Sequence, residues 1–184
     1  MFHFGPIFQE IDFKLVSFIK ENSKGEISLS LQGLVRQVKN DKIYIASIPG
    51  LDKILKLVDL LFANEAEIKT LLSNVGLKDL NSINKLGPRV VVVTRGEKGS
   101  AVFSDKTCFY IPLVKTKEVK DPTGAGDAFV GGFISEYLKS RNIELAALIG
   151  SAAASFVVEN YGPSRFPKDS NEIFERLKKP NFAL

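Results

Sequence analysis

The sequence predicts an α/β fold with a largely parallel central sheet flanked by helices, and three observations support this. Segments of helical and strand periodicity alternate along the chain. Two continuous apolar runs, Val58–Ala63 and Val90–Val93, are typical of strands buried on both faces. The first of them ends in a polar cluster, as strands do where an open sheet binds a ligand. With 184 residues and ordinary globular composition, we expect one domain over residues 1–184.

The first third of the chain contains a helix, a strand and a possible hairpin. Apolar residues at helical spacing predict an amphipathic helix over about residues 9–22. Alternating apolar residues predict a strand over residues 27–31, which the pair Gln32–Gly33 interrupts. Residues 42–48 alternate as an edge strand or hairpin arm, and residues 51–57 predict a short helix.

The rest of the chain continues the alternation, with turn residues between most segments. The elements expected here are helices near 71–72 and 80–86, strands at 90–93, 101–103 and 109–114, and helices from about Gly124, over 145–158 and over 168–178.

The stretch Asp121-Pro-Thr-Gly-Ala-Gly-Asp-Ala-Phe129 predicts a turn that runs into a helix. Pro122 cannot donate to a strand ladder, and apolar residues at helical spacing follow Gly126. The first turn of such a helix carries free N–H groups and the positive end of the helix dipole, and two glycines let a phosphate approach the backbone. The turn therefore predicts an anion site.

Asp127, in the first turn of this helix, has two interpretations. An acidic residue there complements the helix dipole by about 0.3–1 kcal/mol and needs no further role. Beside a phosphate site, however, its carboxylate can accept a proton from an attacking hydroxyl while the amides stabilise the transferred group. We favour the catalytic interpretation.

The whole stretch from Asp121 to Gly132 resembles the C-terminal signature of the ribokinase-like (PfkB) family of carbohydrate and nucleoside kinases. Other phosphate motifs fit worse, because the chain has no G-x-x-x-x-G-K-[ST] and no third glycine at dinucleotide spacing. The resemblance implies a three-layer ribokinase-like fold. It also implies an anion hole formed by the amides of Gly124, Ala125 and Gly126, with Asp127 as catalytic base and Thr123 at the nucleotide.

Asn64 and Glu67 follow the first buried strand and also have two interpretations. Asn64 as N-cap with Glu67 three residues later is a capping-box variant that needs no function. In the PfkB family, an Asn-x-x-Glu motif at this point organises Mg²⁺ and its waters. The resemblance therefore implies that Asn64 and Glu67 hold the magnesium.

Three further assignments depend on the family. A glycine-bearing hairpin turn explains Gly96 and Gly99, but the family's Thr-x-Gly-x-x-Gly implies that Thr94, Gly96 and Gly99 contact ATP. Small residues such as Gly150 usually serve close helix packing, whereas the resemblance places Ser151 near the adenine. The loop Tyr161-Gly162-Pro163, together with carbonyls near Asp121, resembles one that can hold a monovalent cation such as K⁺.

Composition limits the partners and the compartment. The net charge of +4 comes from scattered lysines, which hints at anionic ligands and not at nucleic acid. The single Cys108 and single His3 leave no internal disulfide and no zinc set, which suits a reducing cytoplasm. The longest uncharged run is shorter than the ~20 residues that cross a bilayer, so we expect no membrane partner.

The resemblance implies an enzyme that transfers the γ-phosphoryl group of ATP, with Mg²⁺, to a small-molecule acceptor: a sugar, an inositol-like polyol or a nucleoside. Family members are much longer, and the acceptor-binding first half of their fold is absent from this chain. The alternative is therefore a nucleotide-binding module, or a truncated fragment, without turnover of its own. Missing neighbours would leave apolar surface and a sheet edge uncovered, so we also expect self-association.

Overall fold

The structure is a computed structural model that describes residues 1–46, 49–77, 80–104, 107–162 and 164–178. Contacts within the chain define two compact units, which are Met1–Arg95 with Ala101–Cys108, and Gly96–Ser100 with Phe109–Leu184. A single domain over residues 1–184 stays a prediction.

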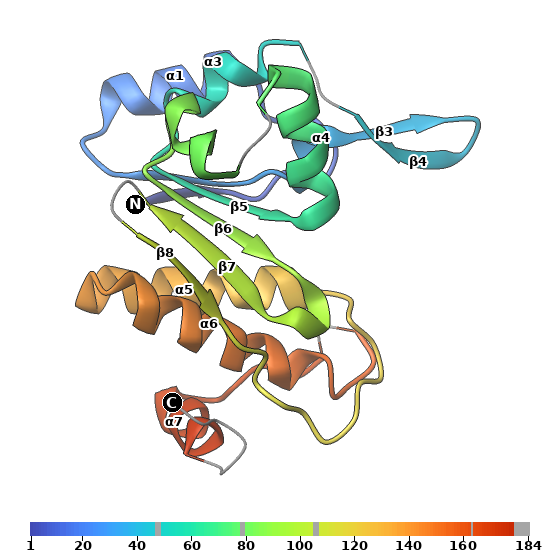
Figure 1. Cartoon of the computed structure of the whole chain (residues 1–184), viewed down its shortest axis with the longest axis vertical. Coiled ribbons are helices and arrows are strands. Elements are labelled where there is room, and N and C mark those ends of the chain that lie inside the picture. Colours follow the sequence, from blue (N-terminus) through green and yellow to red (C-terminus); the bar gives the residue numbers. More distant parts are fainter. Residues whose placement is uncertain (47–48, 78–79, 105–106, 163, 179–184) are drawn as a thin grey trace. The chain divides into compact units, whose positions relative to one another are not determined.

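A largely parallel sheet runs through the chain (Figure 1). Its strands stand in the order β1-β2-β5-β6-β7-β8, and the pairs β1–β2, β2–β5 and β5–β6 are parallel. Their bounds are β1 (Phe2–Phe4), β2 (Ile27–Ser30), β5 (Leu60–Asn64), β6 (Val90–Thr94), β7 (Ser100–Ser104) and β8 (Cys108–Ile111). Because parallel strands point the same way, the carboxyl ends of β2, β5 and β6 share one edge of the sheet.

The two apolar runs form the buried strands that the sequence predicts. All four valines of β6 are at most 1% exposed, and Leu60 and Leu61 of β5 are fully buried. Because both faces of these strands are buried, apolar side chains are favourable at every position, and the strands show no alternation of polar and apolar residues.

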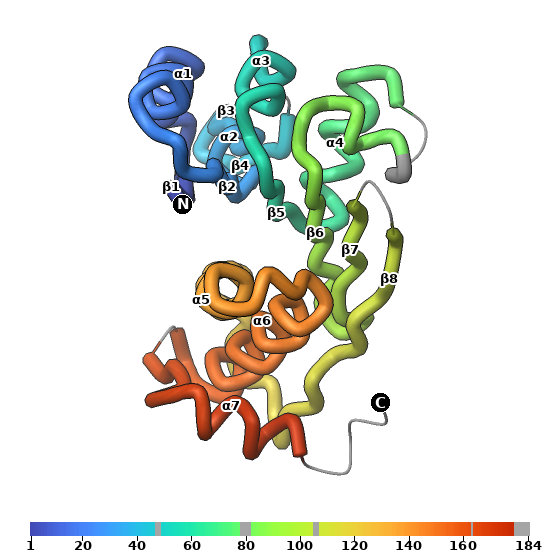
Figure 2. The backbone as a smooth tube through the Cα atoms, turned by 90° about the vertical axis from the view of Figure 1, so that its left-hand side faces the viewer, coloured from blue at the N-terminus to red at the C-terminus, as the bar shows by residue number. Residues whose placement is uncertain are grey.

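Helices of the first unit lie together on one face of its strands (Figure 2). They are α1 (Phe13–Asn22), α3 (Leu51–Leu55), α4 (Glu65–Val75) and the 3₁₀ helix η1 (Leu80–Leu86). Helix α1 begins four residues later than the predicted start at residue 9. The cause is local, because the Asp12 carboxylate caps the helix by accepting from the N–H of Leu15 at 2.9 Å.

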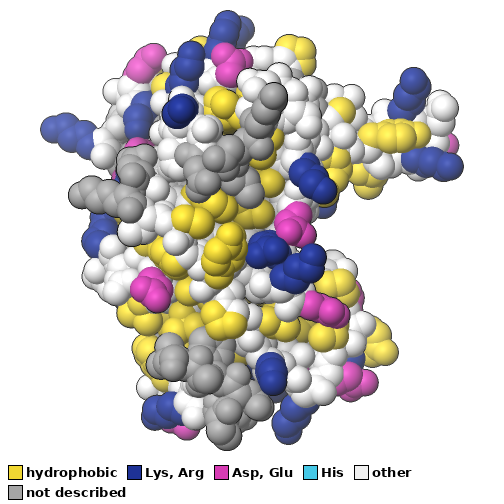
Figure 3. Space-filling model, in the orientation of Figure 1, with side chains coloured by type: hydrophobic (Ala, Val, Ile, Leu, Met, Phe, Trp, Pro, Cys, Tyr) yellow, Lys and Arg dark blue, Asp and Glu magenta, His cyan; other side chains and the backbone are white. Residues whose placement is uncertain are grey.

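A short helix and a hairpin follow β2. Helix α2 (Gln32–Val35) stands where the sequence suggested only a break, and it leads into the antiparallel pair β3 (Arg36–Lys39) and β4 (Lys42–Ile45). Asn40 and Asp41 join the two strands with positive φ angles of 51° and 57°, as a two-residue hairpin turn requires. This confirms the predicted hairpin arm as far as residue 45, and residues 47–48 lie outside the described residues. Lysines and apolar side chains cover the arm in Figure 3.

The second unit contains the long helices α5 (Ala125–Ser140) and α6 (Ile143–Val157), the short helix α7 (Ser170–Leu177) and the 3₁₀ turn η2 (Gly96–Lys98). Helices α5 and α6 pack closely at Gly150. A Cβ at this position would lie only 2.7 Å from the carbonyl oxygen of Phe129. Gly150 therefore serves close helix packing, which confirms the structural interpretation of that residue.

Within the described residues, no helix is both long enough and apolar enough to span a membrane.

Candidate active site

The carboxyl ends of β5 and β6 bring Asn64 and Thr94 together. The two residues are direct register partners in the parallel ladder. The Thr94 hydroxyl also donates to the carbonyl oxygen of Ala63 at 3.4 Å, which links the two strand ends. Two of the predicted site residues are thus neighbours at the sheet edge where ligands of open α/β sheets bind.

Asn64 and Glu67 form a complete capping box at the start of α4. The Asn64 side-chain oxygen accepts from the N–H of Glu67 at 2.9 Å, and a carboxylate oxygen of Glu67 accepts from the N–H of Asn64 at 2.9 Å. The side-chain amide of Asn64 donates to the other carboxylate oxygen at 2.8 Å. The capping interpretation is confirmed. These bonds leave further lone pairs on the carboxylate, so the cap does not prevent a role in magnesium binding, and that role stays a prediction.

The Glu67 carboxyl is unusual because its residue is only 5% exposed. Burial raises its pKa, while the hydrogen bond from Asn64 N–H and the positive charge of Arg36 act in the opposite direction. Mg²⁺ keeps several waters when a protein binds it. The free lone pairs of this poorly solvated carboxylate could accept hydrogen bonds from those waters. Among the described residues, no group of three or more His, Cys, Asp or Glu side chains could hold a metal alone.

Asp121 organises the turn before α5. One carboxylate oxygen accepts from the N–H of Thr123 at 2.9 Å, and the other accepts from the N–H of Gly162 at 2.8 Å. The hydrogen bonds from the Thr123 side chain and backbone, and then from Gly162, lower the pKa of Asp121. The loop assigned to a monovalent cation is thereby fixed to the Asp121 turn, although Pro163 of that loop lies outside the described residues.

The first turn of α5 presents unused N–H groups. Gly124 is the N-cap residue before α5 and has a φ of 82°, which glycine adopts without strain. The amide of Ala125 donates to the carbonyl of Pro122 at 3.1 Å. Within the described part of the chain, the amides of Gly124, Gly126 and Asp127 donate to no acceptor. Of the three amides predicted to form the anion hole, only that of Ala125 is occupied within the described part of the chain, and the Asp127 amide is open as well. The anion hole of Gly124, Ala125 and Gly126 stays a prediction.

Space in front of this turn is open. A Cβ built on Gly126 would meet no atom within 4 Å, so a ligand can approach the backbone there. The exposed Asp127 lies in the same turn and lines a hollow of about 340 Å³ together with residues of α5, α6 and the segment leading into α7. The helix dipole, free amides and a carboxylate thus meet at one helix end.

Gly96 and Gly99 play different roles in the turn after β6. Both have positive φ, 56° and 76°. A Cβ on Gly99 would stand 2.1 Å from the carbonyl oxygen of Ile111, so close packing requires this glycine. A Cβ on Gly96 would meet nothing within 4 Å, which leaves its backbone accessible to a ligand. Of these two glycines, Gly96 has the backbone that is more accessible to a ligand, and the ATP contacts of Thr94, Gly96 and Gly99 stay predictions.

Ser151 is only 6% exposed, and its hydroxyl binds the backbone. It accepts from the N–H of Val114 at 3.3 Å and lies 3.5 Å from the carbonyl oxygen of Pro112. These bonds hold the segment after β8 against α6. A direct contact of Ser151 with adenine stays a prediction.

Comparisons with known proteins identify the family of the chain. Residues 6–170 match the family model described as pfkB family carbohydrate kinase. The chain is 32% identical to a nucleoside kinase of Methanothermobacter thermautotrophicus over 83% of its own length and 48% of the relative's. It is 31% identical to a cytidine kinase of Thermococcus kodakarensis, over 88% of this chain and 56% of that one.

A solved structure shares the fold. The nucleoside kinase of Methanocaldococcus jannaschii, an archaeal member of the ribokinase family, superposes with a TM-score of 0.76 at 28% identity, covering 91% of this chain and 54% of its own. The predicted ribokinase-like α/β fold is confirmed. The chain spans about half the length of the curated relatives it matches. By the match over residues 6–170, the chain belongs to the PfkB family of carbohydrate kinases.

Proposed function

We propose that this chain supplies the ATP-binding and phosphoryl-transfer part of a kinase that acts on a hydroxyl of a sugar, polyol or nucleoside. The observation that carries the proposal is the first turn of α5, where free amides of Gly124, Gly126 and Asp127 surround an open approach to the backbone. Such a turn binds the charge of a transferring phosphoryl group and adds a carboxylate at the same place.

In the proposed reaction, Asp127 accepts the proton of the acceptor hydroxyl. The hydroxyl oxygen bonds to the γ-phosphorus of ATP while the bond from that phosphorus to the bridging oxygen breaks, and ADP leaves. The free amides stabilise the charge on the transferring oxygens. Asn64 and Glu67 would hold Mg²⁺ through its waters, and the bound ion would offset the negative charge of the phosphates.

The remaining assignments concern the nucleotide. Thr94 and Gly96 would line its phosphates and ribose, with Gly99 shaping the turn, and Thr123 and Ser151 would lie at the phosphate and adenine ends. A monovalent cation such as K⁺ would sit where Asp121 binds the loop at Gly162. Since the relatives compared above include nucleoside and cytidine kinases, a nucleoside is the first acceptor to test.

The second candidate is a nucleotide-binding module that does not turn over alone. It is favoured by the finding that the chain covers only about half of the length of its relatives. Apolar side chains near the edge strand β1 are also exposed, including Phe2 at 43% and Ile7 at 67%. Such a surface favours self-association, which light scattering would reveal.

MgATP is expected to raise the melting temperature of the isolated chain. A ligand that binds only the folded state adds about 2.7 kcal/mol of stability at a hundredfold excess over its dissociation constant. The measurement is thermal unfolding with and without millimolar MgATP, monitored by circular dichroism. A folded chain whose melting temperature does not move with MgATP contradicts both candidate functions.

The variant Glu67→Gln separates the magnesium role from the capping role. Glutamine can still accept from the N–H of Asn64, because a capping box tolerates either residue. The fold should persist, whereas the extra stabilisation by MgATP over metal-free ATP should largely disappear. If Glu67→Gln keeps the full difference between MgATP and ATP, then Glu67 only caps α4.

A further inference from the structure

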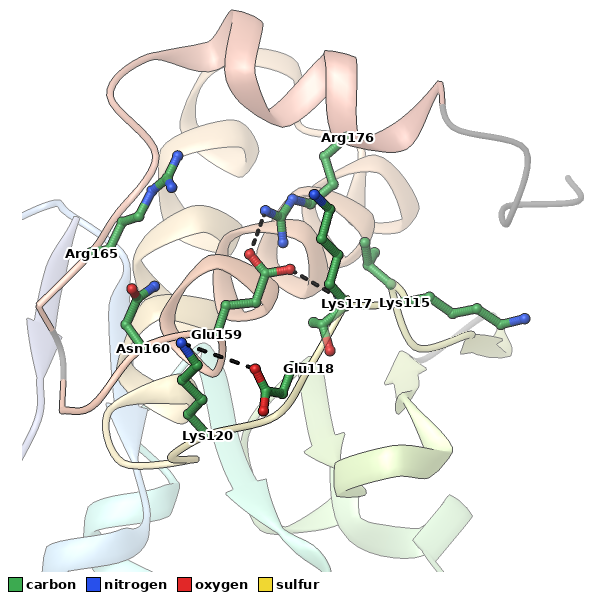
Figure 4. Close-up of a pocket in the computed structure, with 10 residues that line it drawn as sticks. Lys115, Lys117, Glu118, Lys120, Glu159, Asn160, Arg165 and Arg176 are labelled. Atoms are coloured by element: carbon green, nitrogen blue, oxygen red, sulfur yellow. Dashed lines mark hydrogen bonds and ion pairs between the residues drawn. The ribbon is translucent and has the colours of Figure 1, made fainter.

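A pocket of about 610 Å³ lies within the second unit, and the proposed reaction does not use it (Figure 4). Its walls come from the segment 114–120, from the connection between α6 and α7, and from α7. Its volume suits a small organic ligand. Basic side chains dominate the lining, namely Lys115, Lys117, Lys120, Arg165 and Arg176, against the two acidic side chains Glu118 and Glu159.

Arg176 and Glu159 form one part of the pocket wall and neutralise each other. Their ion pair measures 2.8 Å, and both side chains are less than one-fifth exposed. The guanidinium also lies 3.6 Å from the ring centroid of Phe156 and donates to the carbonyl of Ser155 at 3.0 Å. Burial alone would raise the pKa of Glu159, but the hydrogen bonds and charges of its partners, above all Arg176, lower it instead. Glu159 is therefore ionised at neutral pH.

The other basic side chains of the pocket form weaker ion pairs or none among the described residues. Lys120 is 4.0 Å from the exposed carboxylate of Glu118, a distance at which a surface pair contributes little. Arg165 pairs with Glu172 at 3.4 Å and remains about half exposed. Among the residues that the structure describes, Lys115 and Lys117 form no ion pair. The pocket thus carries a surplus of positive charge in a concave site, where the charge attracts anions more strongly than on a flat surface.

The pocket is connected to the Asp121 turn through the backbone. The N–H of Lys117 donates to the Glu159 carboxylate at 3.3 Å, and the N–H groups of Lys120 and Asp121 both donate to the carbonyl of Val158, at 2.8 and 3.3 Å. The lysine-bearing segment is therefore attached to the end of α6 immediately before it enters the turn. A ligand that binds its lysines would restrain Asp121 as well.

We propose that this pocket is a second phosphoryl-anion site, separate from the first turn of α5, which binds a small molecule carrying a phosphate monoester or diphosphate and thereby restrains the Asp121 turn. Lysines bind phosphate as mobile point charges, and charge-assisted hydrogen bonds to phosphate are among the stronger ones in proteins. The proposal does not depend on ATP binding at α5.

Pyrophosphate is the probe, titrated calorimetrically into the Gly126→Val variant, in which the α5 turn is obstructed. Binding should persist in this background. The added pair Lys117→Gln and Lys120→Gln should weaken it about 100-fold, because two bonds to a charged group are lost and each is worth roughly a factor of ten. Pyrophosphate should also slow hydrogen exchange of the Gly162 amide, which donates a hydrogen bond to the Asp121 carboxylate.

The matched control is the pair Lys14→Gln and Lys24→Gln, which removes the same charge from exposed positions of the first unit. It should leave the pyrophosphate affinity nearly unchanged. Equal weakening by both pairs would show a general charge effect and overturn the proposal. Complete loss of binding in Gly126→Val alone would also overturn it, because all binding would then belong to the α5 turn. Unchanged exchange at Gly162 with pyrophosphate bound would remove the link to Asp121.

Discussion

Replacing Asp127 by Asn is expected to lower acceptor-dependent turnover by about 10²–10⁴-fold, while the affinity for MgATP stays similar. The amide keeps the shape of the carboxylate but cannot accept the acceptor's proton. Turnover is measured as ADP release with nucleoside, sugar and inositol acceptors, in a form of the protein that also carries the acceptor-binding half of the family fold. MgATP affinity is measured by thermal unfolding of the chain itself.

Glu144→Gln is the matched control for this experiment. Glu144 lies in the first turn of α6 as Asp127 lies in the first turn of α5, so each substitution removes one negative charge from a helix N-terminus. Each should cost about 0.3–1 kcal/mol of stability. Only Asp127→Asn should affect turnover. If Asp127→Asn retains most of its turnover, Asp127 is a helix-end charge and the proton acceptor lies elsewhere.

Gly126→Val is expected to weaken MgATP binding about 100-fold or more. The valine side chain would occupy the open space in front of Gly126 and keep the phosphates away from the free amides of Gly126 and Asp127. Two lost hydrogen bonds to a charged group, at about 1.5 kcal/mol each, give a change of this size. Calorimetric titration with MgATP measures it.

Gly131→Val controls for the effect of valine in the same helix. Gly131 also lies in α5, and its Cβ would likewise meet nothing within 4 Å. Glycine and valine are both weak helix formers, so neither substitution should change stability by much more than about 0.5 kcal/mol. MgATP affinity should be kept in Gly131→Val. Equal loss in the two variants would mean that nucleotide does not bind at the first turn of α5.

The sequence predicted most of the longer elements but missed the short β1, α2 and β3. The other errors concern the ends of elements. The strand predicted over residues 109–114 ends at Ile111, because Pro112 has no N–H to donate and the N–H of Val114 binds Ser151 instead. The helix predicted from residue 9 begins at Phe13, after the Asp12 cap. Periodicity identifies the element, whereas side-chain hydrogen bonds determine where it stops.

The candidate site was predictable to a similar extent. Asn64 with Glu67, and the glycines before Asp127, could be identified because capping and tight turns depend on residues a few positions apart. The sequence could not decide between capping and magnesium binding at Glu67, and the structure confirms the cap. It also could not indicate that Glu67 is buried, which raises the pKa of that carboxyl.

By itself, the sequence determined the buried parallel strands β5 and β6, the capped start of α4 and the glycine-rich start of α5. These features depend on local periodicity and turn chemistry, which short stretches of sequence contain. Only the tertiary structure decided that the Asp121 carboxylate accepts from the N–H of Gly162, 41 positions away, and that Ser151 binds the backbone of Val114. It also assembled the basic pocket from segments that are separate in sequence. Hydrogen-bond partners and pockets depend on which distant segments meet, and only the packing of the folded chain determines that.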